Sequence, residues 1–170
     1  MSRLKHHTPS YNSSWPPLKA ILEYLNHTGA MKQFELQDDV SLNEILENKL
    51  LLVAVIKQGI PYNLFEAIVA ASPLDHDQWA KLLFISNGTL KEHEAQQTPF
   101  LGIQAEKMIE VVEVLHAGHE AFDTASRFSH WLGYDNYALG GKKPFDLLFD
   151  SYGKDLVLSE LIRIEHGVFV

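Results

Sequence analysis

The segment 121–170 constrains the fold most, because short apolar stripes in it alternate with glycine and proline. Trp131 and Leu132 follow Phe128 at three and four residues, a spacing that places all three on one face of a short helix. Trp131 is expected to anchor that helix. Gly133 is expected to end it. The pattern predicts a small helical unit with sharply defined turns.

Capping residues and a loop define the next part of this segment. Asp123 or Thr124 can accept a hydrogen bond at the start of the first helix. Residues 134–143 have the composition of a loop, and Gly140-Gly141 allows it to close through positive φ. Pro144 suits the first position of the following helix, where its missing N–H leaves no bond unmade. The sequence therefore predicts helix, loop and helix in close succession.

A final amphipathic helix is predicted from Lys154 onward. Gly153 is expected to break the preceding element, and Gly167 is expected to cap the end of the last helix. The apolar positions that indicate this helix are Val157, Leu158, Leu161, Ile162 and Ile164. The residues Val168–Val170 then follow as an apolar tail, which can pack on the chain itself or contact a partner.

Many residues of this segment, at their spacing, resemble the toxin-binding domain of the Xre/MbcA/ParS antitoxins. The resemblance is strong over 121–170, weaker over about 55–115, and absent before residue 50. The residues that carry it are Ala125, Trp131, Leu132, Asn136, Ala138, Leu139, Gly140, Gly141, Pro144, Leu147, Leu148, Gly153, Val157, Leu161, Ile164, Glu165, Gly167, Val168 and Phe169.

The resemblance implies the antitoxin of a bacterial type II toxin–antitoxin module. Its partner would be a RES-domain or ParT-type toxin that acts on or uses NAD, and inhibition would be steric. The residues expected to contact the toxin are Arg163, Glu165, His166, Val168, Phe169 and Val170. The motif residues of the domain are Trp131, Asn136, Leu139, Gly140, Gly141, Pro144, Gly153 and Gly167. Of these, five are expected to shape the surface rather than touch the partner: Trp131, Leu139, Gly140, Gly141 and Pro144.

The segment 73–115 has the pattern of a helix-turn-helix unit. Asp75 and Gln78 can form a capping box at the start of its first helix. The stretch 85–90 resembles the turn and the second-helix entry of an Xre-type unit, which in a DNA-binding protein lies in the major groove. The candidate DNA-contacting residues are Ser86, Asn87, Thr89, Lys91 and His93.

Acidic residues argue against that contact. Glu92 and Glu94 surround the candidates, where the resembling family carries arginines, and carboxylates repel phosphate. Two interpretations remain open: a DNA-binding unit, and a helical scaffold that only displays the C-terminal domain.

The first fifty residues are predicted to form an extension. Residues 1–16 are polar and form an arm, and a helix is expected to follow and to end near Gly29. The capping box Ser41–Glu44 predicts the start of a second helix that runs to Gly59. Its apolar centre 50–56 predicts either core packing or a subunit contact.

A helix is predicted from Gln104 to about His116. Its apolar stripe is Met108, Val111, Val112 and Leu115, and its predicted solvent side is Glu106, Lys107, Glu110 and Glu113. Gly118 is expected to end it. A small helical metal-dependent hydrolase that uses His116, His119 and His130 is an alternative hypothesis, although solvated histidines are the simpler interpretation.

Composition restricts the remaining classes. The 170 residues include 22 acidic and 14 basic side chains, which favours a basic protein partner over nucleic acid. The absence of cysteine excludes disulfides and thiolate metal sites. There is no apolar run of about 20 residues and no signal peptide pattern, so a cytoplasmic location without membrane contact is expected. No phosphate-binding loop, H-E-x-x-H or G-x-S-x-G motif occurs, so we expect no catalysis, cofactor or metal.

The sequence thus predicts an all-α protein in three parts: an N-terminal arm and helical extension (1–50), an Xre-like helix-turn-helix domain (51–117) and a toxin-binding domain (118–170). Homodimerisation and autorepression through operator DNA are further expectations. The alternative to an antitoxin is a stand-alone helix-turn-helix transcription regulator.

Overall fold

The structure is a computed structural model that describes residues 15–167. Within that range the chain forms eleven α-helices, one 3₁₀ helix and no strand, which confirms the all-α prediction. The N-terminal helices are α1 (Pro17–His27), α2 (Ala30–Gln33), α3 (Leu42–Glu47) and α4 (Lys49–Gln58). The central helices are α5 (Tyr62–Ala70), α6 (His76–Leu82), α7 (Asn87–Gln96) and α8 (Ile103–Ala121). The C-terminal elements are α9 (Ala125–Gly133), η1 (Tyr137–Leu139), α10 (Pro144–Leu147) and α11 (Ser151–Glu165).

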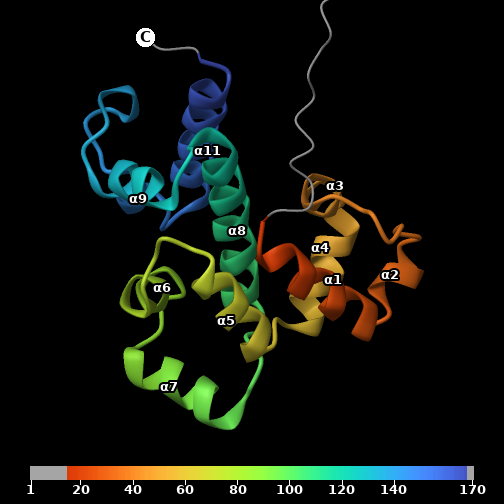
Figure 1. Ribbon diagram of the computed structural model, residues 1–170. Coiled ribbons are helices and arrows are strands. Elements are labelled where there is room, and N and C mark those ends of the chain that lie inside the picture. The colour runs from red at the N-terminus through yellow and green to blue at the C-terminus, as the bar shows by residue number, and fades with distance from the viewer. Residues whose placement is uncertain (1–14, 168–170) are drawn as a thin grey trace, which may run out of the picture.

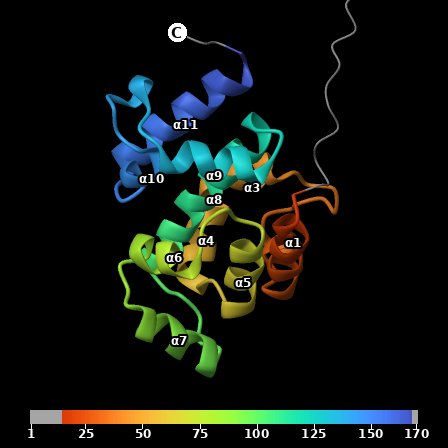
Figure 2. The same cartoon turned by 60° about the vertical axis from the view of Figure 1, so that its left-hand side comes forward.

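Helix α8 is the central support of the molecule. It packs against α11, α4 and α9, and its apolar face is buried at Met108, Val111 and Leu115, as predicted. Figures 1 and 2 both show α7 at one end of the molecule and α11 at the other, and Figure 1 shows α1 to α4 to one side of α8. Because α8 spans 103–121, it runs across the boundary predicted at 117–118, and the two units share one helix.

Gly118 does not end α8, contrary to the prediction. It is buried inside the helix, where an added Cβ would lie 2.1 Å from Cζ of Phe128. The absence of a side chain at Gly118 therefore allows the Phe128 ring of α9 to pack directly on α8. This packing offsets the lower helix propensity of glycine.

The N-terminal extension is built from short helices. Helix α1 ends before Gly29, as predicted, and the Ser41 capping box is present: the Glu44 N–H donates to Ser41 Oγ, and the Ser41 N–H donates to the Glu44 carboxylate. The predicted single helix to Gly59 is wrong, because the backbone turns at Asn48 (ψ 85°). The Asn48 side chain accepts from the N–H of Leu51 and so starts α4 as a separate helix.

The apolar centre of α4 is only partly core. Leu51 and Leu52 are buried, but the Leu50 and Val53 side chains are exposed by 74% and 46%. The core interpretation therefore fails for Leu50 and Val53, which form part of an exposed apolar face. Of the predicted polar arm, only Trp15 and Pro16 belong to the described residues, and Trp15 is buried beside His116, with ring centroids 6.1 Å apart.

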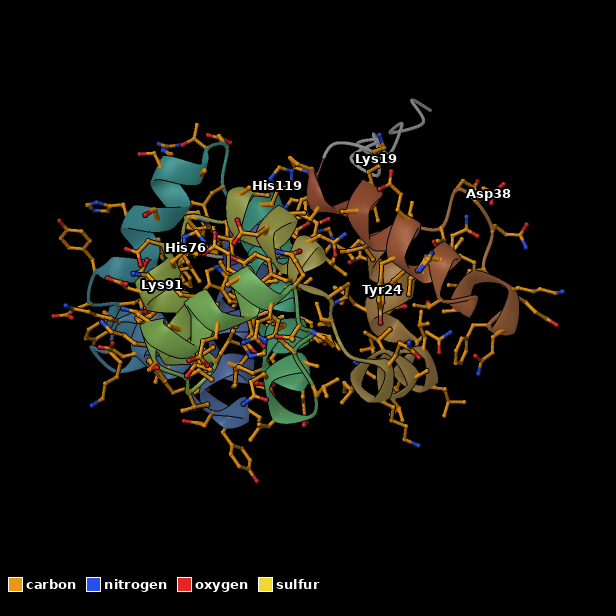
Figure 3. The ribbon with its side chains drawn as sticks, turned by 90° about the horizontal axis from the view of Figure 1, so that it is seen from below. Lys19, Tyr24, Asp38, His76, Lys91 and His119 are labelled. Carbon is orange, nitrogen blue, oxygen red and sulfur yellow. The ribbon has the colours of Figure 1, made fainter. Side chains whose placement is uncertain are left out.

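A long-range hydrogen bond fastens α1 to the end of α4. Tyr24 projects from α1 (Figure 3), and its hydroxyl donates to the carbonyl of Gly59 at 2.7 Å. Burial raises the pKa of Tyr24 to about 12. The Tyr24 hydroxyl therefore stays protonated, and can donate this hydrogen bond, at neutral and moderately alkaline pH.

Polar side chains form a seam between α8 and the C-terminal helices. Lys107 was predicted on the solvent side but is buried, since its ammonium donates to the carbonyl of Leu148 at 3.1 Å and pairs with Glu110. Glu113 pairs with Lys154 at 2.9 Å. Burial alone would lower the pKa of Lys154, but the bonds to Glu113 and Asp155 raise it above its usual value. These contacts fix α10 and α11 on α8.

Over the described range, none of the helices combines the length and the apolar character that a membrane crossing requires.

Candidate functional site

The C-terminal domain begins with α9. The Thr124 hydroxyl accepts from the N–H of Arg127 at 3.3 Å and caps the helix, which resolves the two capping candidates in favour of Thr124. Phe128 and Leu132 are buried, whereas Trp131 is half-buried. Trp131, the expected anchor of the helix, packs at the edge of the core, because Phe128 occupies the space above Gly118.

The loop after α9 is held in one shape by its own backbone. Asn136 Oδ1 accepts from the N–H of Ala138 at 2.8 Å, and Asn136 pairs with Lys142 across the loop. Gly140 and Gly141 have φ of 68° and 73°, as the predicted closure requires. Leu139 fixes the loop to the core with 9% exposure. The motif residues Asn136, Leu139 and the glycine pair thus shape this surface.

Gly153 lies inside α11 rather than between two elements, so the predicted break is wrong. Asp150 Oδ1 caps α11 by accepting from the N–H of Gly153 at 2.8 Å. An added Cβ at Gly153 would lie 2.1 Å from the carbonyl oxygen of Leu147. The glycine is needed because α10, which starts at Pro144 as predicted, passes against the first turn of α11.

Helix α11 presents one face to the core and its C-terminal end to solvent. Val157 and Leu161 are fully buried, whereas Glu165 and His166 are exposed. Arg163 pairs with Glu160 at 3.1 Å. Gly167 has φ of 68° and donates to the carbonyl of Ile164, which confirms the predicted cap. The predicted contact residues Val168, Phe169 and Val170 lie outside the described residues.

An open hollow of about 860 Å³ lies between α9, the loop with η1 and the end of α11. Sequence reasoning missed it, because its walls come from segments that meet only in the folded domain. Its aromatic and charged lining consists of Phe122, Asp123, Arg127, His130, Trp131, Tyr134, Asp135 and Tyr137, and Ile164 adds the contribution of α11.

Contacts within the hollow orient several of these side chains. Arg127 pairs with Asp123 at 2.8 Å. The His130 and Tyr134 rings stack with centroids 4.0 Å apart. Trp131 lies 5.7 Å from the Phe122 ring, and Tyr137 at the rim is 98% exposed. The surface is thus aromatic, and its shape is set before any partner arrives.

The five candidate DNA-contacting residues lie on α7 and at its start, where most engage in bonds within the chain. Ser86 Oγ accepts from the N–H of Thr89 and also bonds the Thr89 hydroxyl, and Asn87 donates to Asp77 at 2.8 Å. The His93 ring stacks on Phe100 at 4.2 Å. Only Lys91 of the five is a fully exposed cation, and Figure 3 shows it on α7, far from Asp38 of the N-terminal extension.

The turn before α7 carries a strained residue. Phe84 has φ of 56° although it is not glycine, and its side chain is 59% exposed. The ring lies 6.2 Å from that of Phe149, so the turn also touches the C-terminal domain. The predicted capping box of Asp75 and Gln78 is present.

The histidines of the metal hypothesis are engaged in separate places. His116 bonds Asn43 Oδ1 at 2.9 Å, and His130 stacks on Tyr134. His119, labelled in Figure 3, lines a separate and smaller pocket that also includes Trp15. No cluster of three or more potential metal ligands occurs among residues 15–167. Burial lowers the pKa of His116, and the neighbouring His119 lowers it further. His116 is therefore a neutral packing residue at the junction of α3 and α8.

These features define a class: an all-α protein whose C-terminal helical domain offers a pre-shaped surface of aromatic and charged residues. Residues 117–167 match the family model described as antitoxin Xre/MbcA/ParS C-terminal toxin-binding domain. The C-terminal part of the chain is therefore similar to the toxin-binding domain of Xre/MbcA/ParS-type antitoxins, in agreement with the resemblance seen in the sequence. A search of curated proteins found no match to the chain.

Proposed function

We propose that this protein neutralises a cognate RES- or ParT-type toxin by lying against the toxin and occluding its substrate pocket. The family match over 117–167 carries the antitoxin role. The exposed end of α11 supports the mode of action, because Glu165 and His166 face solvent on a helix that α8 holds rigidly in place. The tail 168–170 extends this surface in the proposal.

Rigidity matters because a pre-organised surface loses little conformational entropy when it binds. The buried residues Val157 and Leu161 fix the axis of α11, and the Lys154–Glu113 pair fixes its first turn. A toxin that contacts the end of α11 therefore meets side chains already close to their bound positions.

Coexpression with the toxin encoded next to this chain tests the proposal. Glu165→Ala with His166→Ala, and separately deletion of 168–170, are expected to restore toxicity to cells while helical circular dichroism stays unchanged. Leu156→Ala, on the exposed flank of α11, is the matched control and is expected to keep neutralisation. Full neutralisation by both altered chains would remove the end of α11 from the mechanism.

Autorepression is a second candidate function. Helices α6 and α7 contact one another across a tight turn, and Lys91 is exposed on α7, as a DNA-contacting helix requires. If α7 contacts operator DNA, Lys91→Ala will weaken binding to the promoter of its own operon and reduce the salt slope by about one. The same unit in a chain without a toxin partner would act as a stand-alone regulator.

A homodimer is proposed from the exposed face of α4. Leu50 and Val53 leave an apolar face on the surface, which is a common feature of subunit contacts. Leu50→Glu is expected to shift the molar mass measured by light scattering from that of a dimer to that of a monomer. Tyr152→Glu, a comparably exposed position on α11, is the control.

A further inference from the structure

We propose that the hollow between α9 and the η1 loop receives a basic side chain, an arginine, on a segment of the cognate toxin. The inference rests on the proposed antitoxin function and adds a second contact surface to the end of α11. The observation behind it is the combination of exposed aromatic rings with an excess of negative charge in one concave site.

The charge of the hollow follows from its lining. Two carboxylates, Asp123 and Asp135, and one guanidinium, Arg127, line it. Arg127 is held by Asp123 at 2.8 Å, so these two charges offset one another. Asp135 is exposed and remains as the uncompensated charge among the three. The hollow therefore favours a cation, and a toxin segment that carries arginine is complementary to it.

The aromatic side chains supply the flat surfaces that a guanidinium stacks on. Trp131 is half-buried next to Phe122, and Tyr134 is stacked on His130, so each ring is held by a neighbour. An arginine placed over such a ring gains cation–π attraction in addition to its bond with a carboxylate. A lysine would gain less, because it lacks the planar fork that stacks and bonds at once.

Tyr137 marks the hollow as a binding surface rather than an unfilled gap. Its side chain is 98% exposed, yet its backbone is fixed by the Asn136 cap and by the pairing of Asn136 with Lys142. Rigid exposed tyrosines are among the residues that contribute most to protein interfaces. The ring makes no contribution to the core, so it is accessible to a partner that enters the hollow.

The hollow is also continuous with the surface of the proposed function. Ile164 lines it from α11, one residue before the exposed Glu165. A toxin that covers the end of α11 would therefore pass over the rim of the hollow. One partner can thus contact both surfaces with a single continuous segment.

The test measures the affinity of purified full-length chain for the toxin encoded next to it, by isothermal titration calorimetry. Tyr137→Ala and Asp135→Asn are each expected to raise Kd by about thirtyfold, as loss of an interface hot spot does. Tyr152→Ala is the matched control, because Tyr152 is 86% exposed on the same domain but does not line the hollow. It is expected to change Kd less than about twofold.

A second measurement identifies what enters the hollow. A photo-cross-linking amino acid at position 137 is expected to yield a toxin peptide that contains arginine, whereas the same amino acid at position 152 yields none. Cross-links from position 137 to a second copy of this chain, or to a toxin segment without a basic residue, would overturn the inference.

The outcomes distinguish a failure of the antitoxin proposal from a failure of the role given to the hollow. If the unaltered chain fails to bind the toxin, the antitoxin proposal itself fails. If the unaltered chain binds and the Tyr137 and Asp135 variants bind equally well, the antitoxin proposal stands and the hollow is not part of the interface. Equal weakening by Tyr152→Ala would likewise overturn the assignment to the hollow.

Discussion

The two units at opposite ends of α8 use their polar side chains in opposite ways. In the C-terminal domain, Glu165, His166 and Asp135 face solvent on a rigid framework. In the α6–α7 unit, Asn87 donates to Asp77 and Ser86 caps its own helix. The C-terminal domain thus leaves these three polar side chains exposed, whereas the α6–α7 unit engages Asn87 and Ser86 in bonds that hold its own shape. A helix-turn-helix pattern thus predicts a shape without predicting which groups stay available.

The largest change in stability is expected where a substitution disturbs the rigid framework of the C-terminal domain. Gly153→Ala places a Cβ 2.1 Å from the Leu147 carbonyl oxygen, so α10 must move away from α11. We expect a loss of about 3 kcal/mol in the free energy of unfolding, measured by urea denaturation. Gly133→Ala is the control, because nothing lies within 4 Å of the added Cβ. A loss of equal size at both positions would show that the close approach is not the cause.

A smaller effect is expected at the polar seam beneath that framework. Lys107→Ala leaves the Leu148 carbonyl and Glu110 without their buried donor. Removing one partner of such a group costs about 2 kcal/mol. The loss is expected mainly in the protection of α10 and α11 amides from hydrogen exchange. Exchange that rises only in α6 and α7 would contradict the role given to Lys107.

The junction between α3 and α8 predicts a modest pH dependence of stability. Burial lowers the pKa of His116 below the value of 6.5 that it has in the unfolded chain. Just below pH 6.5 the unfolded state therefore binds more protons than the native state. The contribution of His116 to the free energy of unfolding is fully present above pH 6.5 and declines as the pH falls toward the native pKa. His116→Gln should flatten the dependence between pH 7.5 and 5.5 in urea denaturation. An unchanged slope would place its origin in other groups.

The smallest effect concerns the side chains of the α6–α7 unit. Asn87→Ala removes one exposed hydrogen bond to Asp77, so we expect a loss of about 1 kcal/mol or less in stability and no change in toxin affinity. Thermal unfolding measures the change in stability, and isothermal titration calorimetry measures the toxin affinity. A marked fall in toxin affinity would show that the α6–α7 unit also takes part in toxin binding and would contradict the difference drawn between the two ends of α8.

The local features of this fold were predictable, whereas those that depend on distant contacts were not. The capping boxes at Ser41 and Asp75 involve residues three positions apart, so the sequence displays both partners. Gly118 and Gly153 look like helix breakers, because the ring and the carbonyl that require them lie in other elements. Lys107 looked solvated, since its acceptor at Leu148 is 41 residues away.

In the candidate site too, local features were predictable and features that depend on distant contacts were not. The closure of the loop at Gly140 and Gly141 was predictable from composition, whereas Asn136 was indicated only by the family resemblance. The hollow was not, because it requires Trp131, Tyr137 and Ile164 from three elements to meet. The exposed Leu50 and Val53 were ambiguous for the same reason: an apolar helix face shows no difference in sequence between core and surface.

Hydrogen–deuterium exchange of the chain, alone and in complex with the toxin encoded next to it, tests the central claim most directly. The account predicts slower exchange in residues 159–167 and in the loop 134–142 on binding, with unchanged exchange in α7. Protection confined to α7, with the C-terminal residues exchanging as in the free chain, would contradict it.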